Sequence, residues 1–122
     1  MVRRNLNMLI GKANLSFNDI DIILGGDLIN QCAVTSFAFC DTGIPFLGLY
    51  GACSTAIEGI ICGSCILKSE SINRVIASAS SHFCASERQY RFPLGYGGQR
   101  TPTAQWTVTG AGCALVCSEG KE

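Results

Sequence analysis

A nearly uncharged segment in the middle of the chain places the tightest limit on the fold. From about Cys53 to Lys68 the residues are apolar or small, and Glu58 is the only charge inside that stretch. A helix that is apolar on almost every side belongs inside a protein. Gly59 and Gly63 each lower helix propensity by about 1 kcal/mol relative to alanine, so another backbone should pack closely against them. The sequence therefore predicts a buried helix that begins at Cys53.

Short apolar runs alternate with helical patterns along the chain. Helices are expected over 3–13 and 28–40, and Asp27 is expected to cap the second. Residues 81–105, rich in Gly, Pro, Arg and aromatic residues, are expected to be irregular. Strands are expected over 20–25, 46–50, 74–80 and 106–118, with the first two buried and the last carrying a glycine bulge. This alternation predicts an α/β fold with a parallel sheet, right-handed crossovers and helices on both faces.

Composition indicates that part of the surface is covered by something else. Hydrophobic residues make up 48% of the 122 residues and charged residues only 15%, against roughly 25% charged in soluble domains. The first expected helix has no strand before it, as if a βα unit had lost its opening strand. We therefore expect residues 1–122 to form a single incomplete domain.

Charge and cysteine content exclude several classes of function. Nine Lys+Arg balance nine Asp+Glu, which leaves no basic field for nucleic acid and no polybasic tract for a membrane surface. We expect no signal peptide and no transmembrane helix, since no apolar run reaches the roughly 20 residues that a span needs. Without an export signal, the eight cysteines are expected to be reduced.

The clearest candidate for chemistry is the turn at residues 50–55 (YGACST), where a strand ends and a helix begins. Cys53 would lie at the positive end of the helix dipole, which favours the thiolate, the nucleophilic form of cysteine. Gly51 and Ala52 leave room for a substrate. The alternative interpretation is a buried cysteine that simply begins a core helix.

The segment after the third expected strand holds a second group of candidates. His82, the only histidine, follows a strand end, where α/β proteins place ligands; alternatively it is a polar surface residue. Arg88, Arg91 and Arg100 could grip carboxylates through their forked guanidinium groups. The alternative is that Glu87 pairs with one arginine in a structural loop.

We expect no metal and no cofactor. Cys62 and Cys65 have the spacing of half a zinc site, and Cys113 and Cys117 could supply the other half. However, structural zinc sites place such cysteines on turns, whereas these pairs fall in an apolar helix and on a strand.

Four longer stretches resemble the stage V sporulation protein AD family of spore-forming bacteria. The short motif GACST around Cys53 alone resembles only the wider thiolase-like superfamily, the thiolases and β-ketoacyl synthases. The four stretches are GGDLINQ (25–31), GIPFLGLYGACST (43–55), SSHFCASERQYRFPLGYGGQR (80–100) and PTAQWTVTGAGCALV (102–116).

This resemblance implies a five-layered αβαβα architecture built from two similar halves, of which the chain matches part of the N-terminal half. The second half, absent here, supplies the histidines, or histidine and asparagine, that partner the cysteine in thiolases and synthases. Cys53 thus matches a nucleophile position without its partners. The pairs Cys62–Cys65 and Cys113–Cys117 are not part of the family pattern.

The resemblance also implies a function. The family is associated with uptake of dipicolinic acid into the developing spore, acting with stage V sporulation membrane proteins on the cytoplasmic side of the inner forespore membrane. Cys53 and His82 are expected to line the ligand site, with Arg88 or Arg91 nearby on grounds of charge. We expect the chain to be inactive alone, and the sequence leaves open whether it forms a homo-oligomer. The alternative is an acyltransferase with Cys53 as nucleophile, so enzymatic activity is an open question but not the main expectation.

Overall fold

The computed structural model describes residues 1–29, 32–90, 102–103 and 107–118. Within these ranges the chain alternates helices and strands, as expected for an α/β protein. The elements in chain order are α1 (Val2–Ala13), the short 3₁₀ helix η1 (Phe17–Asp19), β1 (Ile22–Asp27), α2 (Ala33–Phe39), β2 (Phe46–Gly48), the 3₁₀ helix η3 (Ala52–Ser54), α3 (Thr55–Ile66), β3 (Arg74–Ser81), α4 (Phe83–Tyr90) and β4 (Gly110–Cys117).

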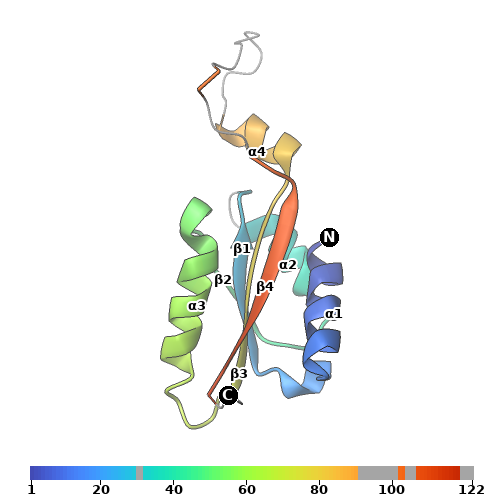
Figure 1. The fold of residues 1–122 in the computed structure, drawn as a ribbon, viewed down its shortest axis with the longest axis vertical. Helices are drawn as coiled ribbons and strands as arrows, with labels where there is room; N and C mark the ends of the chain where they lie inside the picture. The colour runs from blue at the N-terminus through green and yellow to red at the C-terminus, as the bar shows by residue number, and fades with distance from the viewer. Residues whose placement is uncertain (30–31, 91–101, 104–106, 119–122) are drawn as a thin grey trace.

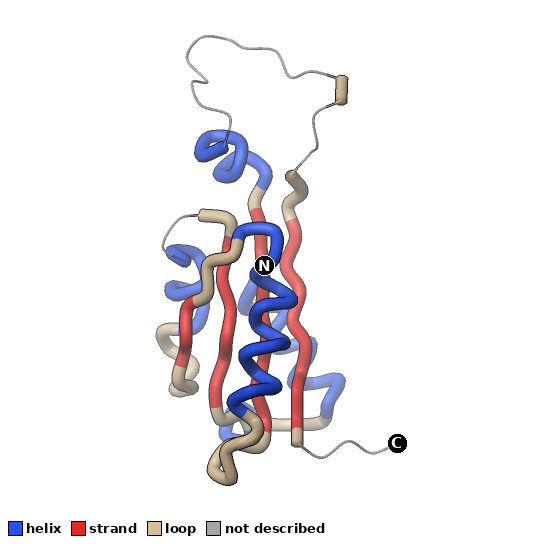
Figure 2. Tube along the Cα trace, turned by 90° about the vertical axis from the view of Figure 1, so that its left-hand side faces the viewer, coloured by secondary structure: helices blue, strands red, loops and turns tan. Residues whose placement is uncertain are grey.

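The four strands form one mixed sheet in the order β2-β1-β3-β4, shown in red in Figure 2. β1 lies parallel to both β2 and β3, which confirms the mostly parallel sheet. β4 runs antiparallel to β3, so the expectation that all strands pair in parallel is wrong for the last strand. The expected glycine bulge is also absent, because pairing continues without a break from Arg74–Cys117 to Ser81–Gly110.

Helices cover both faces of the sheet, as Figure 1 shows: α1 and α2 lie on one side and α3 on the other. α1 buries a stripe at four-residue spacing, namely Val2, Leu6 and Ile10, which is the periodicity of one helix face. These side chains join Ile23 of β1 and Ile76 of β3 in the main apolar core. α1 and α2 therefore cover much of this face of the sheet.

Of the helices that the structure describes, α3 alone covers the other face. A Cβ atom at Gly59 would lie 3.2 Å from the Ala77 Cβ, and one at Gly63 would lie 3.1 Å from the Val75 Cγ1, so the expected close approach is confirmed. The far side of α3 exposes Ile57 and Ile61, 60% and 58% accessible. The helix is thus buried on one side only, because the sheet is its one large neighbour in the described part of the chain.

Three other expectations need correction. β2 is shorter and more exposed than the expected buried strand over 46–50, since it is an edge strand and Leu47 is 46% accessible. Residues 83–90 form α4 and are not irregular. The helix expected over 28–40 is confined to α2, because Asp27 extends β1 and the backbone at Cys32 is left-handed with φ 54°. No helix in the described ranges is long and apolar enough to cross a membrane.

Asp21 fastens the sheet at the end away from the helix α4. Its Oδ2 accepts hydrogen bonds from the N–H groups of Asn73 (2.8 Å) and Arg74 (2.9 Å). These two bonds hold the pKa of the Asp21 carboxyl below its ordinary value. The carboxylate therefore links the segment before β1 to the start of β3.

This geometry predicts a pH dependence of stability. Because the pKa of Asp21 is lower in the folded chain than in the unfolded one, its contribution is fully present above the unfolded pKa, about 3.9, and is lost as the pH falls through the folded value. Asp21→Asn should therefore reduce the difference in urea midpoint between pH 6 and pH 3. Lys12→Gln, on the exposed end of α1, serves as the control. An unchanged pH dependence in Asp21→Asn would contradict this assignment.

Candidate functional site

The path of the chain through the sheet creates a crevice between β1 and β3. From β1 the chain passes through α2 to β2 on one side, whereas from β3 it passes through α4 to β4 on the other side. Open α/β sheets bind ligands at such a switch point, just beyond the carboxyl ends of the strands. Two pockets lie here, one on each face of the sheet.

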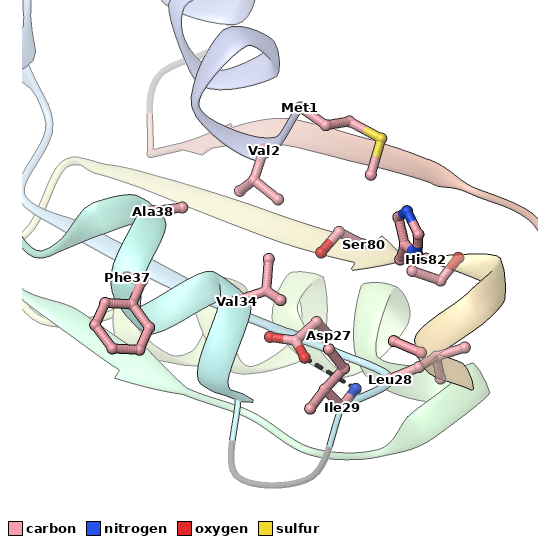
Figure 3. Close-up of a pocket in the computed structure, with 12 residues that line it drawn as sticks. Met1, Val2, Asp27, Leu28, Ile29, Val34, Phe37, Ala38, Ser80 and His82 are labelled. Atoms are coloured by element: carbon pink, nitrogen blue, oxygen red, sulfur yellow. Dashed lines mark hydrogen bonds between the residues drawn. The ribbon is translucent and has the colours of Figure 1, made fainter. Parts of the chain in front are cut away.

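The larger pocket, which we call the His82 pocket, has a volume of about 590 Å³. It opens between α1, α2 and the end of β3, and Figure 3 shows its lining side chains. His82 itself is exposed and directly precedes α4, whose Ser86 N–H donates to the His82 carbonyl (2.9 Å). The lining residues are Met1, Val2, Asp27, Leu28, Ile29, Val34, Phe37, Ala38, Ser80, Ser81, His82 and Ala85.

The second pocket, the Cys53 pocket, has a volume of about 290 Å³. The Cys53 thiol is exposed and lies in η3, directly before α3, so the placement of a cysteine at a helix start is confirmed. Small residues dominate the lining, which leaves the thiol accessible. The lining residues are Leu28, Ala52, Cys53, Ala56, Ala79, Ser80, Ser81, Val108, Gly110, Ala111 and Gly112.

A tight turn fixes the position of Cys53. The Gly51 carbonyl accepts hydrogen bonds from the Ser54 N–H (3.0 Å) and the Ser54 hydroxyl (2.7 Å), while the Gly51 N–H donates to Thr55 Oγ1 (3.1 Å). A Cβ atom at Gly51 would overlap Ser54 Oγ and Glu58 Oε2, so a larger residue here would require these two side chains to move. Ala52 adopts φ 51°, a left-handed conformation that is unusual for alanine.

Cys53 and His82 lie in neighbouring pockets and not in a single one. The two pockets share Leu28, Ser80 and Ser81 as a common wall. The Leu28 N–H donates to the Ser80 carbonyl (3.3 Å), which joins the ends of β1 and β3 within this wall. The structure thus brings both predicted residues to the same crevice but on opposite faces of the sheet.

Asp27 organises the floor of the His82 pocket. It is only 3% accessible, and its carboxylate accepts bonds from the Ile29 N–H (2.9 Å), the Thr35 N–H (2.9 Å) and the Thr35 hydroxyl (2.6 Å). The prediction that Asp27 caps the second helix is wrong, because Cys32 is the N-cap of α2 and Asp27 ends β1. Its carboxylate instead reaches Thr35, the third residue of α2, from the end of the strand. Sequence reasoning missed its place in the pocket, as it missed Leu28 and Ser80; the serines before His82 were the available signal.

The remaining cysteines do not form a metal site in the described ranges, where no group of three potential ligands lies together. All eight are free thiols. Burial raises the pKa of Cys32, with a further contribution from Asp27, and the Cys32 Sγ donates to the Leu49 carbonyl (2.9 Å). Burial likewise raises the pKa of Cys113. These two thiols behave as packed side chains.

The predicted arginines are only partly placed. Arg88 lies on α4, the helix that follows His82. Arg91 and Arg100 lie outside the described residues. Their role at the site stays a prediction.

The whole chain, residues 1–122, matches the family model described as Stage V sporulation protein AD (SpoVAD). The chain belongs to this family. The stage V sporulation protein AD of Bacillus subtilis (strain 168) is 40% identical over 111 residues, which are 91% of this chain and 33% of that protein. The chain thus spans about a third of the length of the curated family member that it matches.

Solved structures extend the likeness to the thiolase-like fold. The chain aligns over 99% of its length with 3-oxoacyl-[acyl-carrier-protein] synthase III from Aquifex aeolicus VF5, with a TM-score of 0.69, 17% identity and 38% of that chain covered. The tetronic acid condensing enzyme AbyA1 gives a TM-score of 0.70 at 15% identity, with 35% of its chain covered. At such low identity the likeness concerns the fold alone, and it confirms the expected partial thiolase-like architecture.

Proposed function

We propose that this member of the stage V sporulation protein AD family takes part in binding dipicolinic acid and supports its uptake into the developing spore. The observation that carries the proposal is the family match over residues 1–122. As the chain spans a third of its curated relative, it would contribute one part of the ligand site. In this proposal the chain alone is inactive.

The crevice between β1 and β3 is the part of the chain suited to such a ligand. Dipicolinic acid is a flat dianion with carboxylates on both sides of a ring nitrogen, and guanidinium forks pair well with carboxylates. Cys53 and His82 lie at the crevice, and Arg88 lies on the helix after His82. In the proposal these three residues, together with Arg91, surround the ligand.

Location and partners follow from the same proposal. The protein would act at the cytoplasmic side of the inner forespore membrane, held there by other stage V sporulation membrane proteins. Self-association into a homo-oligomer is also proposed.

A chimera tests the ligand directly. The aligned third of the Bacillus subtilis relative is replaced by this chain, and dipicolinate binding is measured by calorimetry for the relative, the chimera and the isolated chain. We expect the chimera to bind at submillimolar concentration and the isolated chain to bind at least tenfold more weakly. If the relative binds and a folded chimera does not, the proposal is wrong for this chain.

The position of Cys53 favours a second candidate, acyl transfer. An exposed thiol at a helix start can attack the carbonyl of an acyl-coenzyme A thioester as thiolate. A bond forms between the acyl carbon and the Cys53 sulfur, the bond to coenzyme A breaks, and its thiolate leaves. Mass spectrometry of the chimera with acyl-coenzyme A should then show an adduct that Cys53→Ala removes while Cys84→Ala, another exposed cysteine, retains it. The absence of any adduct would exclude this function.

A further inference from the structure

The outer face of α3 is an apolar surface that the described part of the chain leaves uncovered. Ile57, Ile60 and Ile61 are 60%, 37% and 58% accessible, and the exposed residues Ser64 and Cys65 continue this face one turn further along the helix. In Figure 1, α3 lies at the left edge of the molecule, with no described element on its outer side. Exposed apolar patches on soluble proteins commonly mark interaction sites.

A groove adjoins this face, between α3 and the strands β3 and β4. Its volume is about 350 Å³, and most of its lining from the sheet is small, namely Ala77, Ala79, Gly112 and Ala114. Ile60 lines the groove and also belongs to the exposed face, so exposed apolar side chains and a hollow lie next to each other. An interface between two identical copies about a two-fold axis requires a patch that is complementary to itself. A row of isoleucines beside an apolar groove meets this requirement.

Charge indicates the direction in which two such faces would pair. Between residues 53 and 68 the charged side chains are Glu58 and Lys68. Glu58 has a buried carboxylate oxygen, whereas Lys68 is exposed just beyond the end of α3 and the exposed Cys53 thiol lies just before its start. A parallel pair would bring two Lys68 ammonium groups together, and like charges repel. An antiparallel pair separates them and places each beside a Cys53 thiol, which can become negatively charged.

We propose that the outer face of α3 and the adjoining groove bind a second copy of this chain, with the two α3 helices antiparallel about a two-fold axis beside Ile60 and Ile61. Lys68 of each copy then lies beside Cys53 of the other, so each copy adds a cationic group at the mouth of the other's Cys53 pocket. A cation there favours a ligand that carries a carboxylate. This inference rests on the self-association included in the proposed function and names the surface that forms it.

Sedimentation velocity on the 122-residue chain tests the surface. We expect a monomer–dimer equilibrium that Ile61→Glu weakens at least tenfold, because the substitution places like charges at the two-fold axis. Phe37→Glu on α2, 81% accessible, and Leu47→Glu on the edge strand β2, 46% accessible, are matched controls that should leave the equilibrium unchanged. Circular dichroism checks folding, and Ile57→Glu replaces Ile61→Glu under the same criterion if the latter unfolds. A chain that stays monomeric would assign this face to a different partner and overturn the proposal.

Cross-linking tests the antiparallel direction. An equal mixture of unlabelled and ¹⁵N-labelled chains is treated with a short amine-to-thiol reagent, and mass spectrometry should find Lys68 of one isotope joined to Cys53 of the other. Within one chain these groups lie at opposite ends of α3, about 20 Å apart along the helix, beyond the reach of the reagent. A dimer without mixed Lys68–Cys53 peptides would contradict the arrangement.

The outcomes separate this inference from the proposed function. A dimer that Ile61→Glu leaves intact would preserve self-association and reject only the α3 surface. A monomer would reject self-association as well. Dipicolinate binding is measured on the chimera, so neither result decides the identity of the ligand.

Discussion

Gly26→Ala is expected to cost more than about 4 kcal/mol of folding free energy, enough to unfold most of the chain. A Cβ atom at Gly26 would overlap the Leu49 carbonyl oxygen and would also lie 3.2 Å from Thr55 Cγ2. The first neighbour is backbone that follows β2, so it cannot rotate away as a side chain would. This overlap can be relieved only if the segment after β2 separates from β1.

The control for this substitution lies in the first helix. A Cβ atom at Gly11, in α1, meets no atom within 4 Å, so Gly11→Ala should add up to about 1 kcal/mol through helix propensity alone. Urea denaturation followed by circular dichroism measures both variants. Similar midpoints for Gly26→Ala and the unmodified chain would show that the segment after β2 is not packed as described.

Asp27→Ala is expected to lower stability by more than about 3 kcal/mol, because each hydrogen bond to a charged group is worth about 1.5–3 kcal/mol and three donors would lose their partner. The three donors are the Ile29 N–H, the Thr35 N–H and the Thr35 hydroxyl. The loss should loosen the start of α2 and the floor of the His82 pocket together. Urea midpoints give the stability, and the His82 NMR signals report the pocket.

Thr35→Val provides the matched comparison, since it removes the hydroxyl bond and keeps the shape and the backbone bond. We expect a loss of about 1 kcal/mol. The double variant should lose less folding free energy than the two single variants lose together, as is usual for residues that share an interaction. Strict additivity would mean that the carboxylate and the hydroxyl act independently.

Much of the fold follows from local patterns in the sequence. The apolar runs predicted β1 and β3, and the helical pattern over 3–13 predicted α1. The strand–turn–helix pattern of residues 50–55 predicted the place of Cys53 at the start of α3. These features depend on residues close together in the chain, which is why the sequence is informative about them.

Other features depend on packing between distant segments. The alternation of apolar residues in β4 is the same for either strand direction, so its antiparallel pairing with β3 was not predictable. α4 was missed because the Gly- and Pro-rich residues that follow it dominated the interpretation of that region. The His82 pocket needs α1, α2 and β3 in place together, and no local motif encodes it.

The wall formed by Leu28, Ser80 and Ser81 has an evolutionary consequence. Because each of these residues lines both pockets, a bulkier side chain that narrows one pocket also changes the shape of the other. A substitution at one of these three positions must therefore be compatible with both pockets, whereas a substitution deep in one pocket needs to be compatible with that pocket alone. The ligand specificity of one pocket should accordingly change first through helix residues such as Val34 or Ala56, and only later through the shared wall.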